Sequence, residues 1–325
     1  MNILITGGAG YIGSHLTHHL MNCNHSVTIL DNFNNSLRPT LWGEKVISLD
    51  ISSPHEMDYG FDVEFDAVIH LAAEKQACSH DIYDNILNTI HVYRYCVSHN
   101  IKLMINTSSA AVYGEGVTSI YEESGMVPTS IFHNKIPIDN YGWSKLGAES
   151  ILNTACDSNN ITNVINLRLF NVAGKSVVPS MNKMWQDMGV MSKWRECILN
   201  SEDIIVNDPP DDVNPAKTEM IRDYIHVEDV CKAYEKALSY AQLFVTDRGH
   251  AVTFNIGSGI PTSMSKLISV YEEVLGLKLD VSLEKCKRKE IIVSCADILH
   301  TKNDLKWGSL PDLKNIHQIV ESSLI

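Results

Sequence analysis

Residues 2–15 read Asn-Ile-Leu-Ile-Thr-Gly-Gly-Ala-Gly-Tyr-Ile-Gly-Ser-His, an apolar run that leads directly into a cluster of glycines. The run Asn2–Thr6 is short and largely apolar, which predicts a strand buried on both faces. Residues 11–22 have the apolar spacing of an amphipathic helix. A strand, a glycine-rich turn and a helix in this order predict the opening unit of an α/β domain that binds a nucleotide.

The spacing of the glycines suits a bound pyrophosphate. Gly7 and Gly10 permit a tight turn in which backbone N–H groups approach the phosphates, and Gly13 lets the helix pack closely against the strand. The N-terminus of the helix then stabilises the anionic charge. Asp31 ends the second predicted strand, where a carboxylate accepts hydrogen bonds from the adenosine ribose and repels a 2′-phosphate. The predicted cofactor is therefore NAD and not NADP.

The first half of the chain alternates apolar runs with helical patterns. Strands that alternate with helices form right-handed crossovers and a parallel sheet covered on both faces. The predicted fold class is α/β, a Rossmann-like doubly wound parallel sheet. The predicted strands are Asn2–Thr6, Ser26–Leu30, Lys45–Leu49, Ala67–Ala72, Lys102–Thr107 and Val164–Leu169, and the predicted helices are Tyr11–Asn22, Ile82–Ser98 and Tyr141–Ser158.

The pattern becomes less regular after about residue 171. We expect an NAD-binding domain over residues 1–170, joined by about 222–260, and a smaller mixed α/β substrate domain over 171–221 and 261–325. The later segments comprise an apolar run at Ile204–Val206 and helical patterns at Met184–Leu199, Val227–Ala241, Ser263–Leu275 and Asp312–Ser323.

The composition argues against several other classes of function. The 325 residues carry 26 basic and 39 acidic side chains, and the net charge of −13 disfavours binding to nucleic acid or to an anionic membrane. No apolar run is long enough to span a bilayer. The eight cysteines form no Cys-x-x-Cys pair and the 14 histidines show no metal-ligand spacing, so no metal is expected. Scattered thiols without a basic leader indicate a reducing, cytoplasmic location.

Tyr141 and Lys145 are four residues apart and therefore share one face of the third predicted helix. A phenol is a poor base at neutral pH, because its pKa is near 10. A neighbouring ammonium and a cationic nicotinamide ring would lower the pKa of Tyr141, by roughly three units for about 4 kcal/mol of interaction. Ser108 and Ser109 follow a predicted strand, at the edge where such sheets place site residues. Ser109 is the candidate to share a hydrogen bond with Tyr141 and a substrate hydroxyl, and turn capping is the alternative for both serines.

Seven motifs in a fixed order extend this pattern over the chain. They are Thr6–His15, Asp31-Asn32, His70–Ala73, Ser108–Gly114, Tyr141-x-x-Ser144-Lys145, Arg168–Asn171 and Arg222–Val227. On these residues the chain resembles the extended short-chain dehydrogenases/reductases, and within them the NAD-dependent nucleotide-sugar epimerase/dehydratase family. Its UDP-galactose (UDP-glucose) 4-epimerases are the most similar members.

The resemblance implies roles for residues around a bound NAD. Tyr141 would be the base, Lys145 would hold the nicotinamide ribose, and Ser109 would be the assisting hydroxyl. Asp50 and Ile51 would flank the adenine. The implied cofactor-binding residues are Gly7, Gly10, Tyr11, Ile12, Gly13, Asp31, Asn32, Asp50, Ile51, Leu71, Ala72, Ala73, Lys75, Asn85, Ser108, Tyr141, Lys145 and Phe170.

The resemblance also implies contacts with a nucleotide sugar. Asn171 would touch the phosphates and Arg222 would clamp the diphosphate, a task suited to a charged fork. Lys287 or Arg288 is a candidate second phosphate ligand, and a solvated turn is the alternative for that run of charges. The small side chain of Ser294 would leave room for an N-acetyl group. The implied substrate-binding residues are Ser109, Asn171, Arg222, Tyr224, Lys287, Arg288 and Ser294.

The implied reaction interconverts UDP-glucose and UDP-galactose, and also their N-acetylated counterparts, by transient oxidation at C4 with tightly bound NAD. Ala110 and Ala111 stand where dehydratases of the family carry an acidic pair, which favours epimerisation or simple oxidation at C4 over dehydration. One alternative is another enzyme of the family, such as a UDP-glucuronate epimerase or decarboxylase, or a reductase. The other is an NAD-binding sensor without catalysis. The family further implies a homodimer through the helices Ile82–Ser98 and Tyr141–Ser158.

Overall fold

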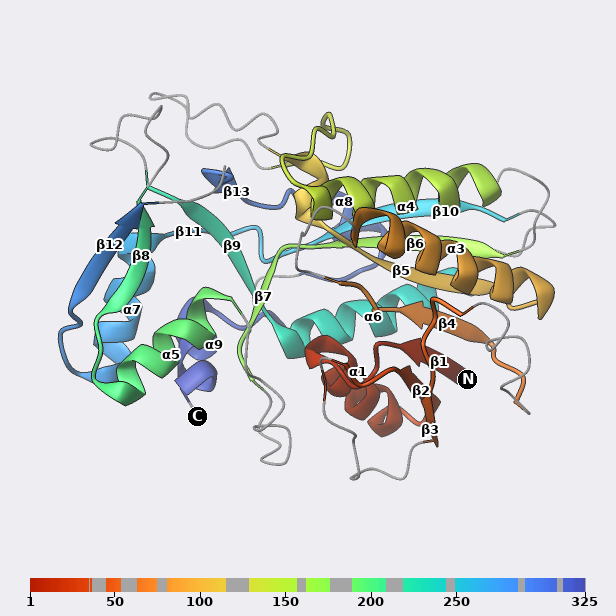
Figure 1. Cartoon of the computed structure of the whole chain (residues 1–325), viewed down its shortest axis with the longest axis horizontal. Helices are drawn as coiled ribbons and strands as arrows, with labels where there is room; N and C mark the ends of the chain where they lie inside the picture. The colour runs from red at the N-terminus through yellow and green to blue at the C-terminus, as the bar shows by residue number, and fades with distance from the viewer. Residues whose placement is uncertain are drawn as a thin grey trace.

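A parallel sheet covered by helices forms the larger lobe of the protein, and a smaller lobe lies at one end of it (Figure 1). The computed structural model describes residues 1–34, 36, 45–53, 63–74, 81–114, 129–156, 162–175, 189–208, 219–243, 249–285, 290–308 and 312–324.

The central sheet has seven strands in the order β10-β6-β5-β4-β1-β2-β3, and every neighbouring pair is parallel. This order confirms the predicted α/β, doubly wound class. Six of the seven strands match predicted runs, and the seventh, at one edge of the sheet, was not predicted. The strands are β1 (Asn2–Thr6), β2 (Ser26–Asp31), β3 (Lys45–Ser48), β4 (Ala67–His70), β5 (Leu103–Ser109), β6 (Asn163–Leu169) and β10 (Ala251–Ile256).

Each face of the sheet is covered by a different pair of helices (Figure 1). Side chains alternate along a strand, so Ile3 and Ile5 pack in one apolar cluster while Leu4 packs in another. The first cluster includes residues of α1 and α6, and the second includes residues of α3 and α4. These helices are α1 (Tyr11–Asn22), α3 (Asp81–Ser98), α4 (Asn140–Cys156) and α6 (Val227–Ala241).

The smaller lobe has its own apolar cluster, which includes Trp194, Leu267 and Ile319 from three helices. The predicted apolar run Ile204–Val206 lies in one short strand of this lobe. The other short strands were not predicted, because polar residues interrupt their apolar pattern. The elements are β7 (Asn171–Ala173), α5 (Val190–Asn200), β8 (Ile204–Asp208), β9 (Ile221–His226), β11 (Pro261–Ser263), α7 (Met264–Leu275), β12 (Val281–Lys285), β13 (Val293–Ser294) and α9 (Ile316–Leu324). A short helix, α8 (Leu299–Asp304), packs beside β10, and a 3-10 turn, η1 (Ala110–Tyr113), follows β5.

The strand order reverses between β1 and β4, which are adjacent in the sheet. Thr6 and His70 are paired at the carboxyl ends of these strands, and their side chains share a hydrogen bond of 2.7 Å. Ligands of open α/β sheets bind in the crevice outside such a switch point. In the part of the chain that the structure describes, no helix is long and apolar enough to cross a membrane.

Candidate active site

The glycine-rich turn between β1 and α1 leaves no room for side chains. Gly7 has φ +69°, and a Cβ there would lie 2.7 Å from the backbone nitrogen of Ala72. A Cβ on Gly13 would lie 2.4 Å from the Gly7 carbonyl oxygen. Gly10 begins α1 without a side-chain cap, and the first turn carries no acidic residue. The close backbone approach and the uncapped helix end fit a bound pyrophosphate.

Replacing Gly13 with alanine should therefore expel the cofactor. The added methyl group meets backbone atoms of Gly7 and Gly8, which cannot turn away as a side chain can. Overpacking of this kind costs about 1–3 kcal/mol, which corresponds to a factor of about 5–150 if the cost falls on NAD binding. The measurement is the NAD released on denaturing the purified protein. Gly147→Ala is the matched control, since a Cβ there meets only the flexible end of Ile86, and an equal loss in both variants would contradict the prediction.

The carboxylate of Asp31 lies at the end of β2 beside this turn. It accepts hydrogen bonds from the Ala9 N–H at 3.0 Å, the Phe33 N–H at 2.9 Å and the Ser36 hydroxyl at 3.0 Å. A carboxylate offers about four acceptor positions, so a further donor can still be accommodated. Asp31 thus ties the glycine turn to β2 as well as standing at the expected ribose position.

Asn32, Asp50 and Ile51 gather beyond β2 and β3, as expected for the adenine side. The Asn32 amide donates to Asp50 at 3.0 Å. This hydrogen bond, with that from the Ser52 N–H, lowers the pKa of Asp50. Ile51 is buried, and its carbonyl oxygen is 3.0 Å from the His91 ring.

Asn85 joins three parts of the site. Its amide oxygen accepts from the Glu74 N–H at 2.8 Å, and its amide nitrogen donates to the Ser144 hydroxyl at 3.1 Å. Asn85 therefore fixes the segment after β4, which includes Leu71, Ala72 and Ala73, against α3 and α4. Lys75 lies outside the described residues.

Tyr141, Lys145 and Ser109 lie together at the start of α4 and the end of β5. The Lys145 ammonium donates to the Thr107 carbonyl at 2.9 Å and lies 5.8 Å from the centre of the Tyr141 ring. Tyr141 is hydrogen-bonded to Ser109. Ser109 also accepts from the Ala111 N–H at 3.2 Å, so it caps η1 as well. The predicted base, its neighbouring cation and the hydroxyl are thus assembled.

The pKa of Tyr141 differs from the sequence-based expectation. Burial raises it to about 12, the hydrogen bond from Ser109 lowers it, and Asp139 raises it. The net shift in the protein alone is upward and not downward, because burial disfavours the phenolate more than the nearby groups favour it. Bringing this pKa from about 12 to about 7 requires about 7 kcal/mol of differential interaction. The remainder must come from groups that bind at this site.

Ser108 belongs to a buried polar network instead of facing the cavity. Its hydroxyl donates to Glu149 at 2.5 Å, and Arg168 donates twice to Glu149, at 2.9 and 2.6 Å. Arg168 also donates to the Tyr113 hydroxyl at 2.7 Å. Glu149 lies two turns after Tyr141 on α4, so the network anchors that helix to β5 and β6.

Five of the predicted residues line one cavity of about 700 Å³. They come from β5, the end of β6, β7, β9 and β13, which are far apart in sequence. The lining consists of the predicted Ser109, Phe170, Asn171, Arg222 and Ser294, with Ala110, Ala111, Ile138, Asp139, Asn140, Leu169, Glu290 and Ile291 in addition.

Arg222 spans the far wall of this cavity. It donates to the carbonyls of Ile221 at 3.0 Å and Ile292 at 3.1 Å, and its other terminal nitrogen is 3.4 Å from the Glu290 carboxylate. Sequence reasoning missed Glu290, because no motif marks it.

Tyr224 is buried in the apolar cluster of the smaller lobe and is not among the cavity-lining residues, so a direct substrate contact is not supported there. Lys287 and Arg288 lie outside the described residues.

The profile of the family described as "NAD dependent epimerase/dehydratase" matches residues 3–257. The chain belongs to the NAD dependent epimerase/dehydratase family. Membership agrees with the glycine turn and with the Tyr141–Lys145 pair, which both lie inside the matched region. The UDP-glucose 4-epimerase of Cyamopsis tetragonoloba is 30% identical to this family member over 314 residues, 88% of this chain and 83% of that protein.

Solved structures of the family have the same fold. The UDP-glucose 4-epimerase from Bifidobacterium longum, in complex with NAD⁺ and UDP, matches 100% of this chain and 97% of its own, with a TM-score of 0.85 at 23% identity. The UDP-Glc/GlcNAc 4-epimerase from Campylobacter jejuni matches 99% of this chain and 98% of its own, with a TM-score of 0.78 at 27% identity. The predicted fold is therefore confirmed over the whole chain.

Proposed function

We propose that this protein is an NAD-dependent UDP-hexose 4-epimerase that interconverts UDP-glucose and UDP-galactose. The observation that carries the proposal is the cavity in which Ser109, hydrogen-bonded to Tyr141, faces Asn171 and Arg222. A hydroxyl at one wall, bonded to the candidate base, and the Arg222 guanidinium at another suit a sugar attached to a diphosphate. The relative from Cyamopsis tetragonoloba, which bears the name of this activity, adds support.

The residues around the glycine turn fit NAD. Gly7, Gly10 and Gly13 would receive the pyrophosphate, Asp31 the adenosine ribose, and Lys145 the nicotinamide ribose. When bound, NAD supplies a hydride acceptor and, once reduced, a hydride donor. We also propose that the chain has two domains. Residues 1–170 with about 222–260 bind NAD, and residues 171–221 with 261–325 bind the nucleotide sugar.

The side chains of the protein move and hold the proton in this reaction. The Tyr141 oxygen takes the proton of the sugar 4-hydroxyl, and Ser109 holds that hydroxyl by a shared hydrogen bond. The Lys145 ammonium favours the phenolate electrostatically. Arg222 and Asn171 hold the diphosphate, so the sugar ring can turn over in the cavity and present its other face. Tyr141 then returns the proton to the 4-oxygen.

The cavity gives little support to dehydration. Ala110 and Ala111 both line it and carry no acid or base. Of the two lining carboxylates, Asp139 accepts from the Gly142 N–H at 2.7 Å at the start of α4, and Glu290 pairs with Arg222. Removal of water across two carbons needs a further acid and base. Epimerisation is the better match.

Arg222 and Glu290 should affect nucleotide binding in opposite directions. Arg222→Met should weaken binding of UDP about 30-fold or more, since truncating one partner of a charged pair costs about 2–5 kcal/mol. Glu290→Gln should strengthen it about fivefold, because the carboxylate competes with the diphosphate for Arg222 across a solvent-screened 3.4 Å contact. Calorimetric titration of both variants with UDP measures the shifts. Weaker binding in Glu290→Gln would contradict the assigned competition.

The test of the proposed function starts from protein purified without added cofactor. Denaturation should release NAD, and the native enzyme should convert UDP-galactose to its 4-epimer, read by NMR. UDP-N-acetylgalactosamine tests whether the small Ser294 in the cavity admits the N-acetylated pair, as the name of the Campylobacter jejuni enzyme suggests. UDP-glucuronate tests the alternative of a uronate enzyme. Bound NAD without turnover of any of the three would favour an NAD sensor.

We also propose a homodimer through α3 and α4, which lie side by side (Figure 1). Both helices expose large apolar side chains: Tyr83 and Leu87 on α3 are 69% and 48% exposed, and Trp143 and Ile151 on α4 are also exposed. Leu87→Arg should convert the dimer to a monomer, measured by light scattering on a sizing column. Leu199→Arg on α5, a leucine elsewhere that is 64% exposed, should not. A monomeric wild-type protein would overturn the assignment.

A further inference from the structure

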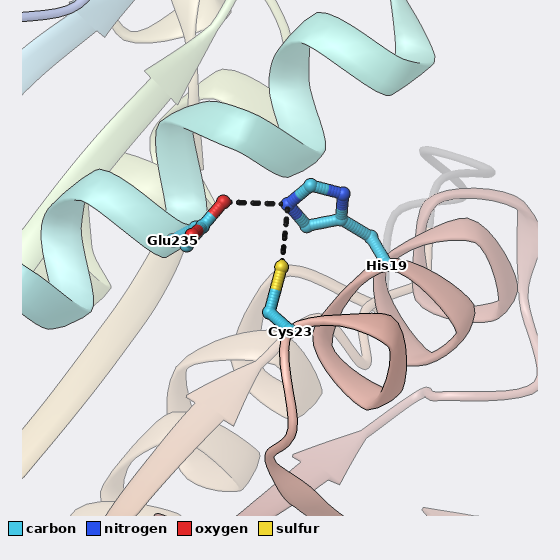
Figure 2. A group of neighbouring side chains, drawn as sticks. All are labelled: His19, Cys23 and Glu235. Carbon is cyan, nitrogen blue, oxygen red and sulfur yellow. Dashed lines mark hydrogen bonds and ion pairs between the residues drawn. The ribbon is translucent and has the colours of Figure 1, made fainter.

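Three potential metal ligands meet on the outside of the larger lobe. His19 and Cys23 lie at the end of α1, and Glu235 lies on α6, which packs against α1 (Figure 2). The His19 Nε2 atom is 2.8 Å from a Glu235 oxygen and 3.9 Å from the Cys23 sulfur. Their ligand atoms all lie within 4.8 Å of one another, and all three side chains are partly exposed.

We propose that His19, Cys23 and Glu235 bind a thiophilic divalent transition metal, with Zn²⁺ as the expected ion. Nitrogen, sulfur and carboxylate oxygen are the donors that zinc takes, at about 2.0–2.3 Å. Tetrahedral bonds of these lengths place neighbouring donor atoms about 3.3–3.6 Å apart. The observed separations bracket this spacing, so small rotations of side chains that are only partly buried would complete the geometry.

The protons and charges of the three side chains are compatible with a bound divalent cation. In the metal-free protein, a proton lies between the His19 ring and the Glu235 carboxylate in their hydrogen bond. For the metal to bind Nε2, the single ring proton of the neutral imidazole moves to Nδ1, and the Cys23 thiol releases its proton to solvent. One thiolate and one carboxylate then balance the two positive charges. Binding should release one proton and strengthen as the pH rises.

His25, two residues after Cys23, carries a further ring nitrogen. The Nδ1 atom of His25 is buried and has no hydrogen-bond partner among the described residues. This nitrogen does not lie within 4.8 Å of all three ligand atoms, so the proposed site consists of His19, Cys23 and Glu235, with solvent as the fourth ligand.

The proposed site is remote from the reacting groups. It lies at the far end of α1 from the glycine turn, about 18 Å away for a helix of this length. A metal there would fasten α1, which carries the cofactor turn, to α6, which follows the strand bearing Arg222. Its expected role is structural. Sequence reasoning did not find it because His-x-x-x-Cys is only half a site, and the third ligand comes from a distant helix.

The test uses the full-length enzyme without a histidine tag, stripped of metal with a chelator. Titration with Zn²⁺ should give one equivalent bound, and a hundredfold excess of free Zn²⁺ over Kd should raise the Tm by about 4 °C. Co²⁺ should give the sulfur-to-cobalt absorption band that reports a thiolate ligand. Cys23→Ser should abolish that band and weaken Zn²⁺ binding at least about tenfold, and Glu235→Gln should weaken it by a similar factor.

Two matched variants control for other ligands. Cys197→Ser removes a thiol of similar exposure outside the cluster. His317→Ala removes a histidine that lies 2.8 Å from Glu273 without a cysteine nearby in the described structure. Both should bind Zn²⁺ as the wild type does. The proposal would be overturned if the wild type failed to bind Zn²⁺. It would also be overturned if Cys23→Ser and Glu235→Gln bound Zn²⁺ as tightly as the wild type, with the same Tm after treatment with chelator.

Discussion

Replacing Tyr141 with phenylalanine should lower kcat for 4-epimerisation by about 10³-fold, in the middle of the range for a positioned acid–base group. Phenylalanine keeps the ring that packs at the start of α4 and loses only the oxygen hydrogen-bonded to Ser109. Bound NAD and the Tm should therefore change little. The measurement is the steady-state rate with UDP-galactose, together with the NAD content of each preparation.

The pH dependence gives the same variant a second readout. Burial raises the pKa of Tyr141 to about 12 in the protein alone, so the phenol is protonated at neutral pH. Because the phenolate is the active form, kcat/KM of the wild type should fall as the pH decreases below the pKa that this group has in the loaded enzyme. This decrease of kcat/KM at low pH should be absent in Tyr141→Phe. Tyr240→Phe on α6 is the control, and retention of more than a tenth of the activity by Tyr141→Phe would sink the assignment.

Arg168→Met should cost about 3–5 kcal/mol of unfolding free energy, because it leaves Glu149 as a buried charge without its partner. Both side chains are almost wholly inaccessible to solvent, at 3% and 2% exposed, and are joined by two hydrogen bonds. Glu149 also anchors α4, so the loss should disturb Tyr141 and Lys145 and lower kcat. Denaturant unfolding and steady-state kinetics measure the two effects.

A double variant distinguishes the effect of the unpaired charge on stability from a general loss of packing. The double variant Glu149→Leu with Arg168→Met removes both charges and should recover part of the lost stability, because apolar pairs of similar size replace buried ion pairs well. Lys278→Met breaks an ion pair at the surface, where Lys278 is 88% exposed, and should leave the unfolding midpoint nearly unchanged. Equal losses in the single and double variants would show that the charge is not the cause.

The first unit of the fold could be predicted to the residue. β1 and α1 have the predicted bounds, Asn2–Thr6 and Tyr11–Asn22, because apolar periodicity and the glycines between them are local signals. Ends of other strands shifted: β4 ends at His70 instead of Ala72, and β5 continues through Ser109. Strand ends depend on the neighbouring strand, since pairing with β6 extends to Ser109 and Leu169.

The strands of the smaller lobe could not be predicted in the same way. β9 contains Arg222, Asp223 and His226, which hide the apolar alternation. Asp223 is nevertheless wholly buried and accepts hydrogen bonds from Ser258, Gly259 and Ala296. Burial raises its pKa and these donors lower it. A polar residue becomes compatible with a buried strand only when distant segments supply its partners.

The nucleotide turn and the candidate base could be identified from local patterns in the sequence. The glycine spacing, Asp31 at a strand end and the pair Tyr141 and Lys145 follow from short-range geometry, in which a helix or strand period places nearby residues on one face. The groups that face these residues are brought there by the tertiary fold. Arg222 with Glu290 across the cavity, Arg168 with Glu149 behind it, and Glu235 beside His19 each join different elements, most of them far apart along the chain. Local sequence patterns do not predict such pairs. The two residues of each pair meet because the apolar faces of the sheet and helices are buried against one another, and the residues between them in the chain do not indicate that contact.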